Sequence, residues 1–174
     1  MEKYAWLFPT IFIVHDMEEI IGLGLFLRNN KEILEEKYPF VLRLNKDFST
    51  EGFSLAVYEE LLLSILITII ALVTNYNVVW YLWLGGFIGC ALHFVVHIGQ
   101  SIILKKYIPA VVTSILLLPI SVHIIYKCIL TIPDNTFFVL IWIFLGIEMV
   151  VLNLLLIHKI IGWYTRKMNL VPII

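Results

Sequence analysis

The sequence contains little charge and little cysteine, and each shortage excludes a class of protein. Lys, Arg, Asp and Glu together make up 14% of the 174 residues, whereas soluble domains carry about 25%. The net charge of −1 provides no basic surface for nucleic acid. The two cysteines, Cys90 and Cys128, form neither a CxxC motif nor a disulfide framework. The first residues also lack the basic segment and cleavage site of a signal peptide, so we expect none.

Apolar side chains, by contrast, are abundant. Hydrophobic residues make up 61% of the chain, and its mean hydropathy is +0.96. A helix that crosses a bilayer needs about 20 mostly apolar residues, and five segments meet this requirement: about 4–27, 53–74, 78–104, 108–130 and 136–161. The sequence therefore predicts an all-α, polytopic membrane helix bundle that forms a single domain over residues 1–174. The polar loop 28–52 separates the first two spans, and we expect a short surface helix from Lys31 to Lys37.

The basic residues are distributed unevenly between the loops, which predicts an orientation. When the loops are assigned alternately to the two sides of the membrane, ten of the twelve Lys and Arg residues fall on one side, with only Lys3 and Lys127 on the other. Lys and Arg concentrate in cytoplasmic loops. We therefore expect a multi-pass protein of the cell membrane with its N-terminus outside and its C-terminus in the cytoplasm. One span more or fewer would scramble this asymmetry.

Ionisable side chains within the predicted spans are the strongest indication of function. A charged residue at the centre of a membrane helix costs about 2.5–3.5 kcal/mol on insertion scales. Six of the 13 acidic residues nevertheless fall inside the spans: Asp16, Glu18, Glu19, Glu59, Glu60 and Glu148. Four of the five histidines also lie there: His15, His93, His97 and His123. At 1.5 Å per residue, most of these groups lie about 10–20 Å from the cytoplasmic ends of their spans, so four helices bring polar groups to one layer.

Helical spacing places the polar groups of two spans on shared faces. His15, Glu18 and Glu19 are three and four residues apart, and His93 and His97 are four apart, which puts each set on one face. Carboxylates and imidazoles that project inward from facing helices form the di-iron and di-manganese sites of helix bundles. There the order within a helix is Glu-x-x-His, whereas here it is His-x-x-Glu-Glu. The zinc motifs H-E-x-x-H and H-x-x-E-H are absent.

The segment His15-Asp16-Met17-Glu18-Glu19 resembles the signature of the HXXEE-domain family of integral membrane proteins. That family carries a His-x-x-Glu-Glu motif, a further histidine downstream and a Tyr-x-Pro-Gly motif. His93 or His97 matches the downstream histidine. The segment Tyr107-Ile108-Pro109-Ala110 matches the last motif, except that Ala110 replaces the glycine. The resemblance covers roughly residues 10–110 and implies no established reaction.

These patterns predict a metal centre on four helices, and the candidate ligands are His15, Glu18, Glu19, Glu59, Glu60, His93, His97 and Glu148. Imidazole and carboxylate donors without thiolates suit iron, manganese or zinc. Six or seven such donors favour two divalent ions over one. Neighbouring helical residues point about 100° apart, so at most one of Glu59 and Glu60 faces the site comfortably.

We accordingly expect a membrane enzyme that acts on a hydrophobic or lipid-like substrate arriving from the bilayer. With iron the reaction would be an oxidation or hydroxylation, and with zinc a hydrolysis. In the hydrolytic case Glu18 or Glu19 would be the catalytic general base. Five spans form a thin wall around a buried site, which is compatible with a homodimer.

Three other interpretations use the same residues. The acids and imidazoles could form the relay of a proton- or cation-coupled carrier or channel, although the sequence shows no inverted repeat and the polar layer lies off the bilayer midplane. Axial ligation of a haem would require a partner other than the His93 and His97 pair, because one helix cannot supply both faces. The cluster could also be a set of hydrogen bonds that hold helices together.

Overall fold

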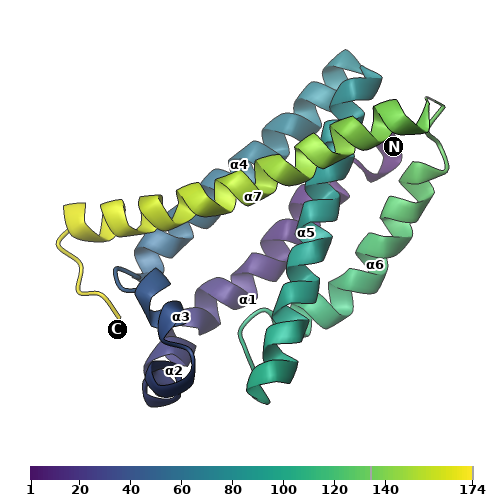
Figure 1. The fold of residues 1–174 in the computed structure, drawn as a ribbon. Helices are drawn as coiled ribbons and strands as arrows, with labels where there is room; N and C mark the ends of the chain where they lie inside the picture. Colours follow the sequence, from purple (N-terminus) through teal and green to yellow (C-terminus); the bar gives the residue numbers. More distant parts are fainter. Residues whose placement is uncertain (134, 174) are drawn as a thin grey trace.

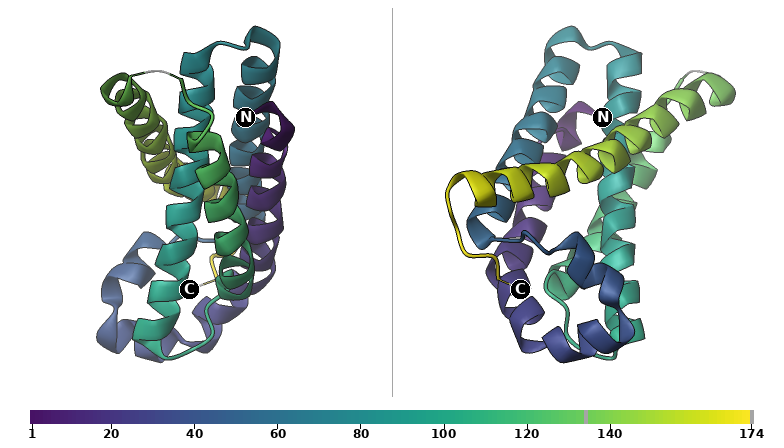
Figure 2. Two further views of the ribbon diagram at one scale, coloured as in Figure 1. Left: turned by 90° about the vertical axis from the view of Figure 1, so that its right-hand side faces the viewer. Right: turned by 60° about the vertical axis from the view of Figure 1, so that its left-hand side comes forward.

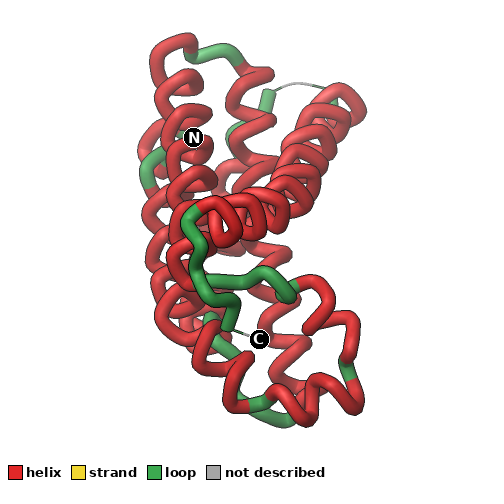
Figure 3. Tube along the Cα trace, turned by 90° about the vertical axis from the view of Figure 1, so that its left-hand side faces the viewer, coloured by secondary structure: helices red, strands yellow, loops and turns green. Residues whose placement is uncertain are grey.

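The computed structural model describes residues 1–133 and 135–173, which fold into helices joined by short connections (Figure 1). A short 3-10 helix, η1 (Glu2–Tyr4), precedes α1 (Leu7–Asn29), α2 (Lys31–Lys37) and α3 (Pro39–Leu44). Four long helices follow: α4 (Thr50–Thr74), α5 (Asn77–Leu104), α6 (Val111–Ile129) and α7 (Thr136–Lys167). Figure 3 shows helices and loops and no strand over these residues. The predicted all-α class is confirmed, as is the short helix at Lys31–Lys37.

Four helices, α4 to α7, are long and apolar enough to cross a membrane. Helix α1 is also long, at 23 residues, but it carries Asp16, Glu18 and Glu19 near its middle. The four candidate spans together with α1 agree roughly with the predicted count of five. The last helix reaches Lys167, beyond the end expected at residue 161. The orientation and the division into domains stay predictions.

Local signals at the helix ends explain the tight connections. Helix α4 begins after Ser49, whose hydroxyl oxygen accepts a hydrogen bond from the Gly52 N–H at 3.1 Å, as expected for an N-cap. It ends at Asn75, which has the left-handed φ of 51°, and α5 ends in the same way at Lys105, with φ 52°. A left-handed residue ends a helix and reverses the chain, so α4, α5 and α6 become neighbours in the bundle.

Helix α7 crosses the other long helices obliquely, as Figure 2 shows. Two glycines make its contact with α5 close. A Cβ atom at Gly85 would collide with the backbone of Ile143, and one at Gly146 would collide with the Leu82 carbonyl oxygen. Small residues allow membrane helices to approach at backbone distance, so α5 and α7 pack closely at these two glycines.

Two apolar cores form, one towards each end of the bundle. The first contains Phe8 of α1 together with Trp83 and Phe87 of α5. The second contains Leu27 of α1 and Leu34 of α2, together with residues of α4 and α7. Along α1, the segment from His15 to Glu19 lies between the residues that join the first core and those that join the second. The ionisable motif is therefore held between two regions of ordinary apolar packing.

Candidate metal centre

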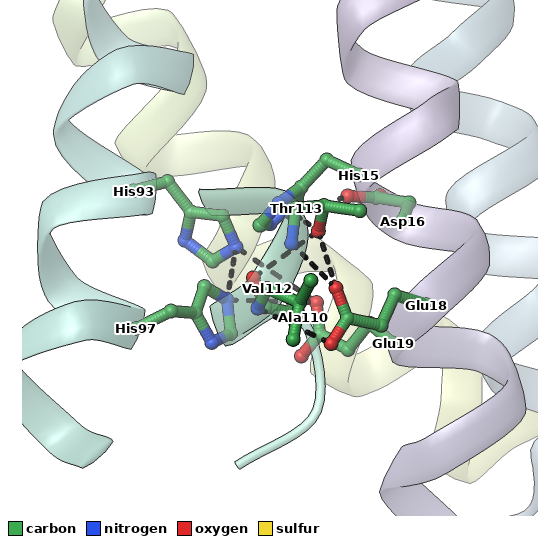
Figure 4. Close-up of polar contacts among 9 residues, drawn as sticks. All are labelled: His15, Asp16, Glu18, Glu19, His93, His97, Ala110, Val112 and Thr113. Carbon is green, nitrogen blue, oxygen red and sulfur yellow. Dashed lines mark hydrogen bonds and ion pairs between the residues drawn. The ribbon is translucent and has the colours of Figure 1, made fainter. Parts of the chain in front are cut away.

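Helices α1 and α5 place imidazoles and carboxylates opposite each other (Figure 4). His15 and Glu19 project from α1 and are one helical turn apart, as are His93 and His97 on α5. Side chains four residues apart lie on the same helical face, so each helix offers two of them to the other. His15 is 0% exposed and His97 is 5% exposed. The two helices thus form a four-residue cluster in which His15 and His97 are buried and Glu19 and His93 are partly buried.

The donor atoms of His15, Glu19, His93 and His97 all lie within 4.8 Å of one another. The Nε2 atoms of His93 and His97 are 2.9 Å apart. They lie 3.9 Å and 3.7 Å, respectively, from Oε2 of Glu19. On an ion with bonds of about 2.1 Å, donors at right angles are about 3.0 Å apart and opposite donors about 4.2 Å. The four side chains therefore have nearly the spacing that one ion requires.

Two buried nitrogen atoms in this cluster have no hydrogen-bond partner among the described residues: Nε2 of His15 and Nδ1 of His97. Buried polar atoms are nearly always satisfied, so an exception needs an explanation. The nearest carboxylate to the His15 nitrogen is Asp16, at 3.9 Å, which is beyond hydrogen-bond distance. A ligand that accepts the lone pair of His15 Nε2 would remove the deficit.

Glu18 has a different environment from Glu19 because it faces the start of α6. Its carboxylate accepts hydrogen bonds from the backbone N–H groups of Val112, at 3.3 Å, and Thr113, at 2.7 Å. It also accepts the phenolic proton of Tyr107 at 2.7 Å. The N-cap residue of α6 is Ala110, whose methyl group cannot accept a hydrogen bond, and which has φ 73°. Glu18 therefore supplies from another helix the cap that α6 lacks.

Thr113 connects this cap to the four-residue cluster. Its hydroxyl proton goes to Glu18 Oε2 at 2.7 Å, while the 3.2 Å contact with His15 joins the hydroxyl oxygen to Nδ1. A hydroxyl has one proton to donate, so we assign the second proton of this chain to His15 Nδ1. That tautomer leaves the Nε2 lone pair directed into the cluster. The contact thus orients a histidine that could ligate a metal ion, as an outer hydrogen-bond partner does.

The other predicted site residues lie outside the four-residue cluster. The Asn153 amide donates to Glu59 at 3.1 Å and contacts Glu60 at 3.5 Å. Of this pair, only Glu60 lines the cavity that also contains Glu19 and the α5 histidines. Glu148 is neither in the cluster nor at the cavity. The four donors that lie together suffice for one ion, whereas the eight candidate ligands named from the sequence favoured two.

Sequence reasoning assigned no role to Thr113 or to the hydroxyl of Tyr107, although both lie in contact with Glu18. Tyr107 was visible as the first residue of a motif, but its spacing from Glu18 predicts nothing because the two lie on different elements. Thr113 carried one signal, its position in the first turn of a helix whose cap residue is Ala110. That signal shows a missing cap and does not identify the partner.

Comparisons with known proteins agree with the motif. A family model described as a protein of unknown function with an HXXEE motif matches residues 6–124. This range includes every residue of the four-residue cluster and the start of α6. Searches of the curated proteins and of the solved structures found no significant match.

Proposed function

The chain belongs to the HXXEE-motif family, whose function is unknown, and we propose that its His/Glu cluster binds one divalent metal ion at the centre of an intramembrane enzyme. The ligands are His15 and Glu19 of α1 with His93 and His97 of α5. The observation that carries this proposal is the gathering of four donor atoms within 4.8 Å in the interior of the bundle. The substrate is a hydrophobic or lipid-like molecule.

An unpaired buried nitrogen atom in the cluster supports a ligand-binding role over a purely structural one. If the cluster only joined α1 to α5, its polar atoms would be paired with one another. Instead the buried Nε2 of His15 has no partner within the described part of the chain. An unpaired buried polar atom costs about 1–3 kcal/mol, and coordination of a cation by the lone pair would recover this cost.

The number of donors indicates the class of metal chemistry. Three imidazoles and one carboxylate would fill the four-coordinate shell that zinc prefers, leaving no position for an activated water molecule. An iron or manganese ion with six positions would keep two open for a substrate. Glu18 is also occupied by hydrogen bonds to α6 and is therefore poorly placed as the general base of a hydrolase. We favour a redox-active ion and an oxidation of the substrate in which dioxygen is the electron acceptor.

The test is elemental analysis of the detergent-purified protein after loading with iron, manganese or zinc. We expect about one ion per chain in the wild type, and loss of that ion in His97→Ala and in Glu19→Ala. The matched control is His123→Ala, because His123 lies on a membrane-spanning helix but is exposed and outside the cluster.

Two results would overturn the proposal. One is the absence of stoichiometric metal from the wild type after loading with all three ions. The other is equal loss of metal in His97→Ala and His123→Ala, which would indicate adventitious imidazole binding. In either case the next experiment would be proton-coupled transport in liposomes, because the carrier interpretation uses the same side chains without a bound metal.

A further inference from the structure

A cavity of about 1050 Å³ adjoins the four-residue cluster and is open on one side. Its walls come from α1, α4, α5 and α7, and residues of α2 and α3 line it at the far end. Small-molecule sites commonly occupy about 300–1,000 Å³. This cavity is therefore large enough for a ligand that is much longer than its reacting group.

The acidic residues of the cavity lie together near the four-residue cluster. Glu19, His93 and His97 line the cavity, and so do the neighbouring carboxylates Asp16 and Glu60. Asp16 is 4% exposed and is close enough to Glu19 and Glu60 for their charges to interact. Towards α2 and α3, the walls are mostly apolar, with side chains such as Leu34, Val41 and Phe48. A ligand would place a polar group beside these acids and an apolar chain along the walls that lead towards α2 and α3.

The rim of the cavity is apolar and exposed. Leu63 and Leu66 of α4, Val96 of α5 and Leu152 of α7 line the cavity and are each about half exposed. Because these helices are apolar enough to span a membrane, exposed leucine and valine side chains there face lipid tails. The ligand would thus enter sideways from the bilayer, without crossing water.

The charged side chains around the cavity restrict which polar end group its ligand can carry. Within residues 1–133 and 135–173, no Lys or Arg lines the cavity. A phosphate or carboxylate group in a protein normally has such a cation as a bidentate or charge-assisted partner. Apart from the proposed ion, whose charge the carboxylate of Glu19 partly balances, such a group would find the carboxyl groups of Asp16 and Glu60 in place of a cationic side chain. A neutral hydroxyl group can donate a hydrogen bond to a carboxylate and accept one from a carboxylic acid, so it pairs with Asp16 and Glu60 in either protonation state.

We infer that this cavity binds a long-chain alcohol, with its hydroxyl group beside Asp16 and Glu60 and its apolar chain directed towards α2 and α3. The inference rests on the proposed function, for which it names the substrate class. A straight fatty alcohol and a branched isoprenoid alcohol share this chemistry.

The experiment uses purified wild-type protein with a photoreactive analogue of hexadecanol in one arm and of geranylgeraniol in the other. Peptide mapping by mass spectrometry locates the crosslinks, and unlabelled competitors test saturability. We expect saturable labelling of peptides that line the cavity. Unlabelled hexadecanol should compete, while hexadecyl phosphate should compete about tenfold less well or worse. The arm with the stronger labelling identifies the straight or the branched chain.

Two adjacent leucines of α4 provide a matched pair of variants. Leu62 and Leu63 are 47% and 45% exposed, but only Leu63 lines the cavity. Leu63→Trp should narrow the rim and reduce the saturable labelling severalfold, whereas Leu62→Trp should leave it unchanged. Equal effects of the two variants would overturn the inference, as would labelling that no competitor saturates. Equal or better competition by hexadecyl phosphate would exclude the neutral end group.

Metal analysis of the same preparations separates the two proposals. If the alcohol binds saturably but no metal does, the proposed enzyme fails and the lipid site stands. If metal binds stoichiometrically in the wild type and in Leu63→Trp but labelling is never saturable, the substrate class is wrong and the metal centre stands.

Discussion

Two of the contacts of helix α1, one with α5 and one with the start of α6, use its polar residues in different ways. Towards α5, Glu19 meets the imidazoles of His93 and His97 at distances that suit a shared ion. Towards α6, Glu18 meets backbone N–H groups and the Tyr107 hydroxyl. The contact with α5 leaves a buried nitrogen atom without a hydrogen-bond partner among the described residues. The contact with α6 provides acceptors for the free N–H groups at the start of that helix.

The difference teaches that the two glutamates of one motif have separate roles. Successive helical residues point about 100° apart, so Glu18 and Glu19 cannot face the same neighbour. The two contacts are joined through Thr113, which binds Glu18 with its hydroxyl proton and His15 with its oxygen. The cap therefore holds a proposed metal ligand, His15, in position, and each of the following variants separates the two contacts.

The largest effect is expected from Glu19→Gln. The amide keeps the size of the side chain but loses the negative charge that balances the ion. Loss of even an outer partner of a ligand weakens metal affinity about 10–100-fold, so we expect about 100-fold or more for Glu19 itself, measured by competition with a metal-sensitive dye. The unfolding midpoint of the metal-free protein should change little because the cap on α6 is intact. Unaltered affinity would remove Glu19 from the ligand set.

Thr113→Val tests the connection between the two contacts. The variant removes the hydroxyl that joins Glu18 to His15 but keeps the shape of the side chain and both backbone hydrogen bonds. We expect about 10–100-fold weaker metal binding and rescue by Thr113→Ser. Ser114→Ala is the control, since the buried Ser114 hydroxyl has no partner among the described residues. A Thr113→Val protein with wild-type affinity would show that the contact does not orient His15.

Glu18→Ala tests the cap itself. The N–H groups of Val112 and Thr113 would lose their acceptor, which costs about 1 kcal/mol and up to about 2 kcal/mol for an N-cap. The measurement is unfolding of the metal-free protein in mixed detergent micelles, with Glu36→Ala, at an exposed position, as the control. We also expect Glu18→Gln to retain much of the stability because its amide oxygen still accepts. If Glu18→Ala were as stable as the control, the capping role would be wrong.

The smallest effect is expected from the Tyr107 hydrogen bond, which lies in the loop between α5 and α6. Burial, followed by the hydrogen bond to Glu18 and the charge of that carboxylate, raises the pKa of Tyr107 to about 12. Because this pKa is raised, the protonated Tyr107 hydroxyl contributes fully to the stability of the fold below about pH 10. This contribution is lost as the pH rises through about 12. Tyr107 is 57% exposed, so Tyr107→Phe should cost less than about 1 kcal/mol.

The Tyr107 titration can be followed by NMR with tyrosine labelled at Cζ. Glu18→Gln should move the pKa of Tyr107 back towards 10.0, the value from which it is raised, because the charged acceptor is gone. A Tyr107 titration that is the same in both proteins would mean that the Glu18 contact does not form in solution.

Much of the fold and part of the site could be predicted from local patterns. Apolar runs predicted the long helices, and their spacing placed His93 and His97 on one face of α5. The same reasoning grouped Glu18 with Glu19, because both are compatible with one broad face, and it included Glu148, because depth alone does not identify a neighbour. Glu60 lines the cavity and Glu59 does not. The rotation of α4 against α7 decides between them, and no spacing within α4 reveals that rotation.

The sequence by itself determined that this protein is helical, that it is apolar enough to cross a membrane, and that it carries ionisable groups within its helices. Each of these follows from composition and from the period of the helix, which are local properties. Only the tertiary structure decided that four of the ionisable residues meet and that Glu18 caps α6. Those contacts join residues on separate helices, with Glu18 lying 94 positions from Val112. The crossing of packed helices sets such contacts, and it depends on the whole bundle.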